Sequence, residues 1–201
     1  MSPVNEKKPS LRISHIAYGR QGVGNRVKYL VDPKGQGDEL KIPEKLVLKR
    51  WRQRTFDGYV FKGAKLSSTL WRAWFVAFGR TDVAKLSETQ IKEKITATKD
   101  ERDARHLKLP EAGAVLALAE HCGKQRIMTL LARHNAESHQ GKSGVPDLFL
   151  YAVHNATNRT SIARFVEVKK PDEPVRDEQK IELSLLNDLG FHARVFRLIE
   201  R

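Results

Sequence analysis

The C-terminal half of the chain alternates between short apolar runs and a helical pattern of apolar positions. Residues 144–151 begin with a Gly-Val-Pro turn and continue as an apolar run, and residues 165–169 form a second run, which predicts two strands. Residues 176–189 carry Ile and Leu on one helical stripe and end before Gly190, a residue typical of helix C-termini. Residues 191–199 alternate into a last strand. The order strand, strand, helix, strand predicts an α/β fold with a mixed sheet flanked by helices.

The N-terminal half carries the patterns of three helices. The first covers residues 44–54, and the second covers residues 68–79, where aromatic residues at helical spacing indicate a buried stripe. The third begins at Ser87 and stays polar to residue 106, and Ser87 and Gln90 have the spacing of a capping box. The aromatic residues expected in the core of the second helix are Trp71, Trp74 and Phe75.

The distribution of glycine and of polar residues divides the chain into a leader and one domain. Residues 1–40 are predicted to be a variable basic leader, in which residues 13–18 and 27–31 form a hairpin between glycine turns. Residues 41–201 are predicted to be one domain, long enough to bury its own core. The polar segment near residues 80–110 is then a helical insertion into that domain.

Three charged residues interrupt the two apolar runs, although an unpaired charge destabilises a sheet core. Asp147 opens the first strand, while Glu167 and Lys169 lie two apart in the second and therefore point to one face. Two carboxylates and the carbonyl of Val168 between them are oxygen ligands suited to Mg²⁺ or Mn²⁺. Such an ion would activate a water and neutralise a phosphate, with Lys169 orienting either group. Salt-bridged strands and surface turns give the same short pattern, so a structural ion pair stays an alternative.

Further candidates for this site lie at predicted helix starts. Glu44 follows a proline, a position at which the helix dipole favours an acid without any other role. Gln179 and Lys180 occupy the first turns of the C-terminal helix, from which they could face the metal. A solvated helix start is the alternative for both residues.

The charge of the chain is concentrated in its first half. The chain has 37 Lys and Arg against 24 Asp and Glu, a net charge of +13 and a pI of about 10.0. Residues 1–110 hold 24 basic against 12 acidic residues, whereas residues 111–201 hold 13 against 12. This excess favours a polyanionic partner whose phosphates contact mainly the N-terminal half. The expected phosphate contacts are Lys49, Arg50, Arg52 and Arg54, which flank Trp51, and Lys142 near the first strand.

The Pro-Asp, Glu-x-Lys pattern resembles that of the PD-(D/E)xK nucleases, and its surroundings resemble the VRR-Nuc family (virus-type replication-repair nucleases), most closely the branch of the Fanconi-associated nuclease. The resemblance implies a restriction-endonuclease-like core with a helical, basic N-terminal half. It also implies that Asp147, Glu167 and Glu44 bind the metal, that Lys169 is the catalytic lysine, and that Gln179 is the glutamine of the family helix. The segments that carry the resemblance are residues 43–48, 57–63, 66–71, 144–151, 165–171 and 178–190.

One departure from the family pattern concerns the number of metal ions. Where the resemblance predicts a second acidic residue beside the glycine of a turn, this chain has Lys62-Gly63. The sequence therefore leaves open whether the site holds one metal ion or two.

Three hypotheses for function follow. The first is a Mg²⁺- or Mn²⁺-dependent DNA nuclease that acts on flap or branched DNA in replication and repair. The second is an antibacterial DNase toxin, delivered by a secretion system and neutralised by an acidic immunity protein. The third is a non-catalytic DNA-binding module, which intact Asp147, Glu167 and Lys169 argue against. The polar insertion, which in related nucleases accompanies a monomeric state, favours a monomer over a homodimer.

Several classes of protein are excluded by composition. The single cysteine, Cys122, excludes an internal disulfide and a zinc ribbon. The N-terminus lacks the apolar region of a signal peptide, and no apolar run reaches the length of a membrane helix. A cytoplasmic protein is expected.

Overall fold

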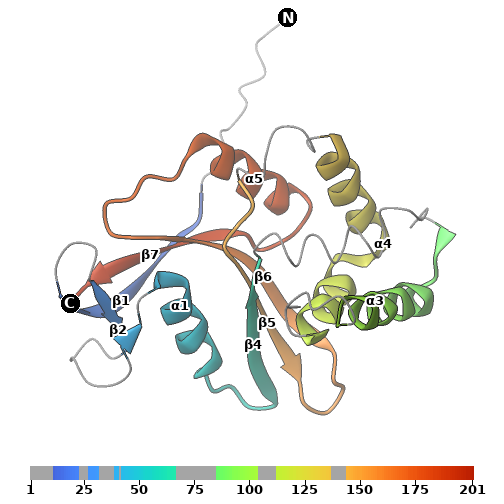
Figure 1. Ribbon diagram of the computed structural model, residues 1–201, viewed down its shortest axis with the longest axis horizontal. Helices are drawn as coiled ribbons and strands as arrows, with labels where there is room; N and C mark the ends of the chain where they lie inside the picture. The colour runs from blue at the N-terminus through green and yellow to red at the C-terminus, as the bar shows by residue number, and fades with distance from the viewer. Residues whose placement is uncertain are drawn as a thin grey trace, which may run out of the picture.

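The computed structural model of the chain is built on one mixed β-sheet (Figure 1). In this sheet β7 lies between β1 and β6 and runs parallel to both, whereas the other neighbouring strands are antiparallel. The structure describes residues 11–22, 27–31, 39–40, 42–66, 85–103, 112–136 and 144–201. Their seven strands, in the order β3-β2-β1-β7-β6-β5-β4, are β1 (Ile13–Gln21), β2 (Lys28–Leu30), β3 (Glu39–Leu40), β4 (Tyr59–Lys65), β5 (Leu148–His154), β6 (Thr160–Lys169) and β7 (Arg194–Glu200).

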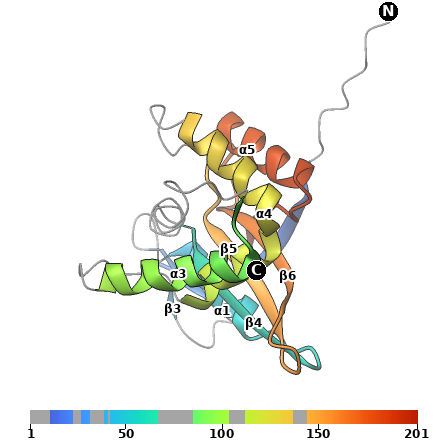
Figure 2. The same cartoon turned by 90° about the vertical axis from the view of Figure 1, so that its right-hand side faces the viewer.

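Helices pack on both faces of the sheet. One face buries Phe149, Phe165 and Val195 against α4 and α5, and the other buries Leu150 and Val166 against α1. Because strand positions alternate between faces, β5 and β6 are buried on both sides. In the described part of the chain, α3 packs on α4 (Figure 2). The described helices are α1 (Pro43–Arg52), α3 (Glu88–Asp103), α4 (Ala112–Ala136) and α5 (Asp177–Asp188).

This architecture confirms the predicted α/β class and the mixed sheet flanked by helices. The C-terminal order strand, strand, helix, strand is β5, β6, α5, β7. The capping box before α3 is also present, since Ser87 Oγ accepts from Gln90 N (3.3 Å) and Gln90 Oε1 accepts from Ser87 N (2.9 Å). The predicted helix at residues 68–79, with Trp71, Trp74 and Phe75, lies outside the described residues.

The predicted N-terminal hairpin and the Lys62-Gly63 turn have different outcomes. Strands β1 and β2 pair antiparallel, with Gly19 opposite Leu30, and β1 also pairs along β7. Lys62-Gly63, by contrast, lies inside β4, so the prediction of a turn there is wrong. The turn lies just before this strand, at Gly58, whose φ of 78° favours glycine.

Gly63 allows α1 to lie close to the sheet. A Cβ atom on Gly63 would lie 2.8 Å from Leu150 Cδ2, 3.0 Å from Leu48 Cδ2 and 3.1 Å from the Phe149 carbonyl oxygen. The indole of Trp51 uses the same close approach, because its Nε1 donates to the carbonyls of Lys62 (2.8 Å) and Tyr151 (3.1 Å). Because Gly63 has no side chain, α1 can pack this close to the sheet.

Among the described residues, no helix is both long and apolar enough to cross a membrane.

Candidate active site

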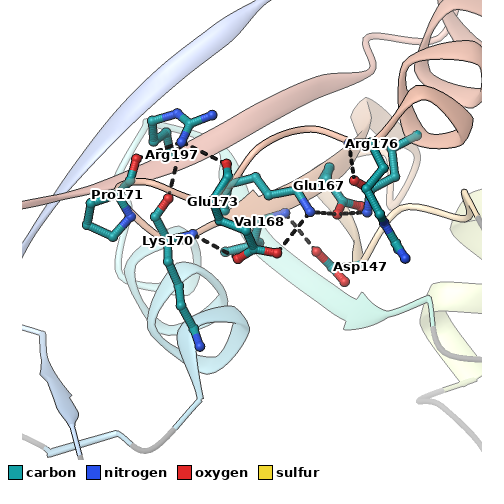
Figure 3. Close-up of polar contacts among 10 residues, drawn as sticks. Asp147, Glu167, Val168, Lys170, Pro171, Glu173, Arg176 and Arg197 are labelled. Carbon is teal, nitrogen blue, oxygen red and sulfur yellow. Dashed lines mark hydrogen bonds and ion pairs between the residues drawn. The ribbon is translucent and has the colours of Figure 1, made fainter. Parts of the chain in front are cut away.

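Asp147 lies at the entrance to β5 and is held by the neighbouring strand. Its Oδ2 accepts a hydrogen bond from the backbone N–H of Val168 at 2.8 Å (Figure 3). Burial raises the pKa of Asp147; the Val168 N–H acts against this, and the charge of Glu44 adds to it. The contribution of Glu44 indicates that an acid from α1 lies near this carboxylate.

Glu167 and Lys169 form a buried ion pair near the end of β6. Their residues are 2% and 3% exposed, and Lys169 Nζ lies 3.0 Å from Glu167 Oε1. Burial, followed by the charge of Asp147, raises the pKa of Glu167 to about 7 despite the nearby ammonium. For Lys169, burial lowers the pKa, but hydrogen bonds and charges from Glu167 and Glu173 outweigh it and raise the pKa. The raised pKa keeps Lys169 an ammonium at neutral pH.

Gln179 connects the start of α5 to Glu167. Its Nε2 donates to Glu167 Oε1, and its Oε1 accepts from the backbone N–H of Arg176 at 3.0 Å. The residue is only 4% exposed, and it closes a capping box at the helix start. Gln179 thus orients Glu167 while it satisfies a backbone donor of the helix. The neighbouring Lys180 is exposed and pairs with Asp177 at 2.7 Å.

Glu44 reaches the same site from the other face of the sheet. It lies in the first turn of α1, directly after Pro43. The side chain lines a cavity of about 350 Å³ together with Asp147, Glu167 and Lys169. The full lining is Ile42, Pro43, Glu44, Asp147, Glu167, Val168, Lys169, Lys170, Glu173, Arg176 and Gln179. The structure therefore gathers all candidate metal ligands and catalytic residues around one cavity.

Two oxygen atoms at this cavity are left without a partner. Glu44 Oε2 and Glu167 Oε2 are buried and accept no hydrogen bond from any described residue. A buried carboxylate oxygen is destabilising unless a donor or a cation satisfies it, so the donor chemistry fits a hard divalent ion. The described residues nevertheless contain no cluster of three His, Cys, Asp or Glu side chains already close enough to bind one ion. The ligand set stays a prediction.

Four site residues were missed by the sequence argument. They belong to the loop between β6 and α5 and to β7, and the sequence predicted no role in the site for any of them. No short motif marks them, because their role depends on how the loop folds back over β6. Lys170, Glu173 and Arg176 line the cavity, and Arg197 binds the backbone of the loop that carries them.

The basic residues in α1 and just after it have structural contacts in the described part of the chain. Arg50 donates from Nε to the carbonyl of Val31 at 2.9 Å, and Arg52 donates from Nη2 to that of Gly63 at 2.9 Å. The guanidinium of Arg54 lies 5.2 Å from the centroid of the Trp51 ring. Phosphate contact by these residues and by Lys49 stays a prediction, and Lys142 lies outside the described residues.

Solved structures with a similar fold include two crystal structures of paFAN1, one bound to 2-nucleotide and one to 1-nucleotide 5′ flap DNA with a gap. Their TM-scores are 0.56 and 0.58, at 17% and 14% sequence identity. Each match covers 98% of this chain and 39% of the paFAN1 chain, so this chain spans well under half of that protein. No curated protein matches the sequence.

Family membership follows from the sequence itself. The VRR-NUC domain matches residues 84–198, which is more than half of the chain and includes Asp147, Glu167, Lys169 and Gln179. Glu44 and α1 precede the matched region, but the fold shared with paFAN1 extends over 98% of the chain. The chain therefore belongs to the VRR-NUC family of nuclease domains.

Proposed function

We propose that the chain is a metal-dependent DNA nuclease that hydrolyses phosphodiester bonds, with a preference for flap or branched DNA in replication and repair. The observation that carries this proposal is the convergence of Glu44, Asp147, Glu167 and Lys169 on one cavity. These residues come from α1, the entrance to β5 and the end of β6, which are distant in sequence.

The choice of DNA substrate rests on the relatives. The two paFAN1 structures contain 5′ flap DNA, and their fold covers nearly all of this chain. The net charge of +13 also favours a polyanionic partner. We extend the flap preference to this chain as part of the proposal.

Mg²⁺ or Mn²⁺ would be held by the carboxylates of Glu44, Asp147 and Glu167 and by the backbone carbonyl of Val168. Such an ion, when bound, lowers the pKa of a coordinated water and offsets the charge of the reacting phosphate. The buried oxygens without partners, Glu44 Oε2 and Glu167 Oε2, support this assignment.

The residues of the chain supply position and charge. Gln179 orients the carboxylate of Glu167, and the Val168 N–H fixes one oxygen of Asp147. Lys169 provides a buried positive charge beside the phosphate position, where low exposure strengthens its electrostatic effect. An ammonium with three N–H donors can orient a phosphate oxygen or the attacking water.

A nuclease assay on linear, 5′ flap and four-way-junction DNA tests this proposal. We expect cleavage in the presence of Mn²⁺ or Mg²⁺ and none in the presence of EDTA. Among the three substrates, the flap DNA should be cleaved fastest. Cleavage that persists in EDTA would exclude the metal-dependent mechanism. Failure to cleave any substrate with either metal would leave only the function of a cationic DNA-binding module.

A further inference from the structure

The loop that joins β6 to α5 is fixed by a side chain from β7. Arg197 Nη1 donates to the backbone carbonyls of Pro171 (2.7 Å), Glu173 (2.9 Å) and Lys170 (3.3 Å), as Figure 3 shows. Arg197 can reach the loop because it lies opposite Lys169 in the parallel pairing of β6 and β7. One guanidinium therefore holds three backbone carbonyls of the loop against the end of the sheet.

The same loop presents Glu173 to the lysine of the site. Glu173 Oε1 lies 3.1 Å from Lys169 Nζ, and Glu173 Oε2 accepts from the backbone N–H of Lys170 at 3.4 Å. The side chain of Glu173 is 43% exposed, whereas that of Lys169 is 3% exposed. Glu173 thus binds the ammonium from the solvent side, and Glu167 binds it from the interior.

These two carboxylates account for the direction of the ammonium. Lysine has three N–H donors and no acceptor, so the carboxylates that it contacts determine where these donors point. Glu167 and Glu173 take two of these donors in the described structure, which leaves the third for an oxygen of a phosphate or of water. Loss of Glu173 would leave the ammonium with a single carboxylate to orient it.

We propose that Glu173, held in place by Arg197, is a positioning residue that fixes the ammonium of Lys169 for phosphodiester hydrolysis. This inference rests on the proposed nuclease function and extends it to a residue outside the Asp, Glu-x-Lys pattern. Glu173 acts through Lys169, and Arg197 acts through the loop that carries Glu173.

The first test measures how fast Lys169 is acylated in the absence of metal and DNA. The full chain is treated with a small amine-acylating reagent, and the rate of modification of Lys169 is followed by mass spectrometry. Glu173→Ala and Arg197→Gln are expected to raise this rate several-fold, because they release the ammonium. Asp172→Ala is the matched control, since Asp172 is an exposed acid of the same loop that makes no ion pair with a described residue. An unchanged rate in Glu173→Ala would overturn the inference.

The second test separates kcat from KM for DNA cleavage. Glu173→Ala is expected to lower kcat about 10- to 100-fold, as for a misplaced catalytic group, with KM within about twofold. Glu173→Gln keeps the shape and one acceptor oxygen, so it is expected to lose less and also serves if the alanine variant does not fold. A kcat equal to or above that of the parent would show that Glu173 restrains Lys169 or is irrelevant to it, and would overturn the inference.

The two tests distinguish this inference from the proposed function. If the parent chain cleaves no DNA, the nuclease proposal fails, while the acylation rates still decide whether Glu173 fixes Lys169. If the parent cleaves DNA and Glu173→Ala behaves like Asp172→Ala in both tests, only the positioning role fails.

Discussion

Glu167 uses its two carboxylate oxygens differently. Oε1 receives the Gln179 amide and the Lys169 ammonium, whereas Oε2 is buried and accepts nothing from the described residues. A buried carboxylate is destabilising when one oxygen accepts hydrogen bonds and the other has no donor or cation near it. The oxygen that faces no donor is therefore the one expected to meet a cation.

Neutral isosteres at the two central acids are predicted to separate catalysis from binding. Asp147→Asn and Glu167→Gln should each lower the cleavage rate by about a hundredfold or more, because each removes a charged ligand of the proposed metal site. DNA affinity should stay within about twofold, since the phosphates are expected to contact the basic N-terminal half. Cleavage kinetics, DNA titration and Mn²⁺ titration of the DNA-free protein measure these effects.

The control for this pair is Asp188→Asn, which changes an exposed acid at the end of α5. It should leave cleavage and Mn²⁺ binding unchanged. Full activity of Asp147→Asn or Glu167→Gln would contradict the assigned roles.

His121 on α4 is predicted to make stability depend on pH. Burial, followed by the positive charges of Arg126 and His192, lowers its pKa to about 4, and its ring lies 5.4 Å from that of Phe191. His121 takes up a proton near pH 6.5 in the unfolded chain but only near pH 4 in the native protein. The free energy of unfolding should therefore fall as the pH is lowered from about 6.5 to about 4. The difference between 6.5 and about 4 corresponds, at about 1.4 kcal/mol per pKa unit, to a loss of at most about 3.5 kcal/mol.

Urea unfolding at several pH values between 4 and 7 measures this dependence. His121→Phe should flatten the curve relative to the parent, because the titrating group is gone, whereas the exposed His15→Gln should leave its slope unchanged. Equal slopes in the parent and His121→Phe would show that His121 does not couple folding to protonation.

At the scale of single residues, the sequence identified the groups that violate their local pattern. Asp147, Glu167 and Lys169 interrupt apolar strands, and this mismatch marks them without a structure. Glu173 and Arg197 could not be found in this way, because a charged loop residue and a polar strand residue are ordinary in those places. Their contacts arise from the parallel register of β6 and β7 and from the fold of a loop, which no local pattern specifies.

At the scale of elements, the close contact between α1 and the sheet depends on Gly63. Alanine is favoured over glycine inside a strand by about 0.5–1 kcal/mol, but overpacking a core costs about 1–3 kcal/mol. With Leu150 fully buried 2.8 Å from the new Cβ, overpacking should prevail. Gly63→Ala is therefore predicted to destabilise the protein, and to slow cleavage because α1 carries Glu44.

Denaturant unfolding and cleavage kinetics together test this prediction. Lys62→Ala, at an exposed position of the same strand, should change stability by less than about 0.5 kcal/mol. If Gly63→Ala is as stable and as active as the parent, α1 is not fixed by this contact.

The elements of the C-terminal half were easier to predict than those of the N-terminal half. Strands β5, β6 and β7 and helix α5 have strong apolar periodicity, whereas β4 contains exposed polar positions and a glycine that resemble a turn. The position of β1 beside β7 could not be predicted either, because a parallel pairing between strands so distant in sequence leaves no local pattern.

At the scale of the whole molecule, the surplus of positive charge is predicted to determine DNA affinity. Arg50 and Arg52 bind backbone carbonyls and contribute to the docking of α1, so substituting them would also disturb the position of this helix. The test therefore uses Lys49 and Arg54, the other two predicted phosphate contacts of this segment. Lys49→Gln and Arg54→Gln should each weaken DNA binding and reduce the slope of log Kd against log salt by about 1.

Titration of DNA at several salt concentrations gives these slopes. Lys124→Gln removes one charge from α4, on the opposite face of the sheet, and should leave the slope unchanged. Equal effects of all three variants would indicate binding driven by net charge alone.

The pairing of β1 with β7 and of β4 with β5 limits how far the protein can be shortened. A fragment of residues 84–198 would lack β1, α1 and β4, which would leave β7 and β5 as unpaired edge strands. The apolar surface that α1 covers would then face water. Exposed edge strands pair with other chains, so this fragment is expected to aggregate on expression. It should not elute as a single folded species in gel filtration. The smallest autonomous unit therefore extends beyond the segment that defines the family and includes β1, α1 and β4.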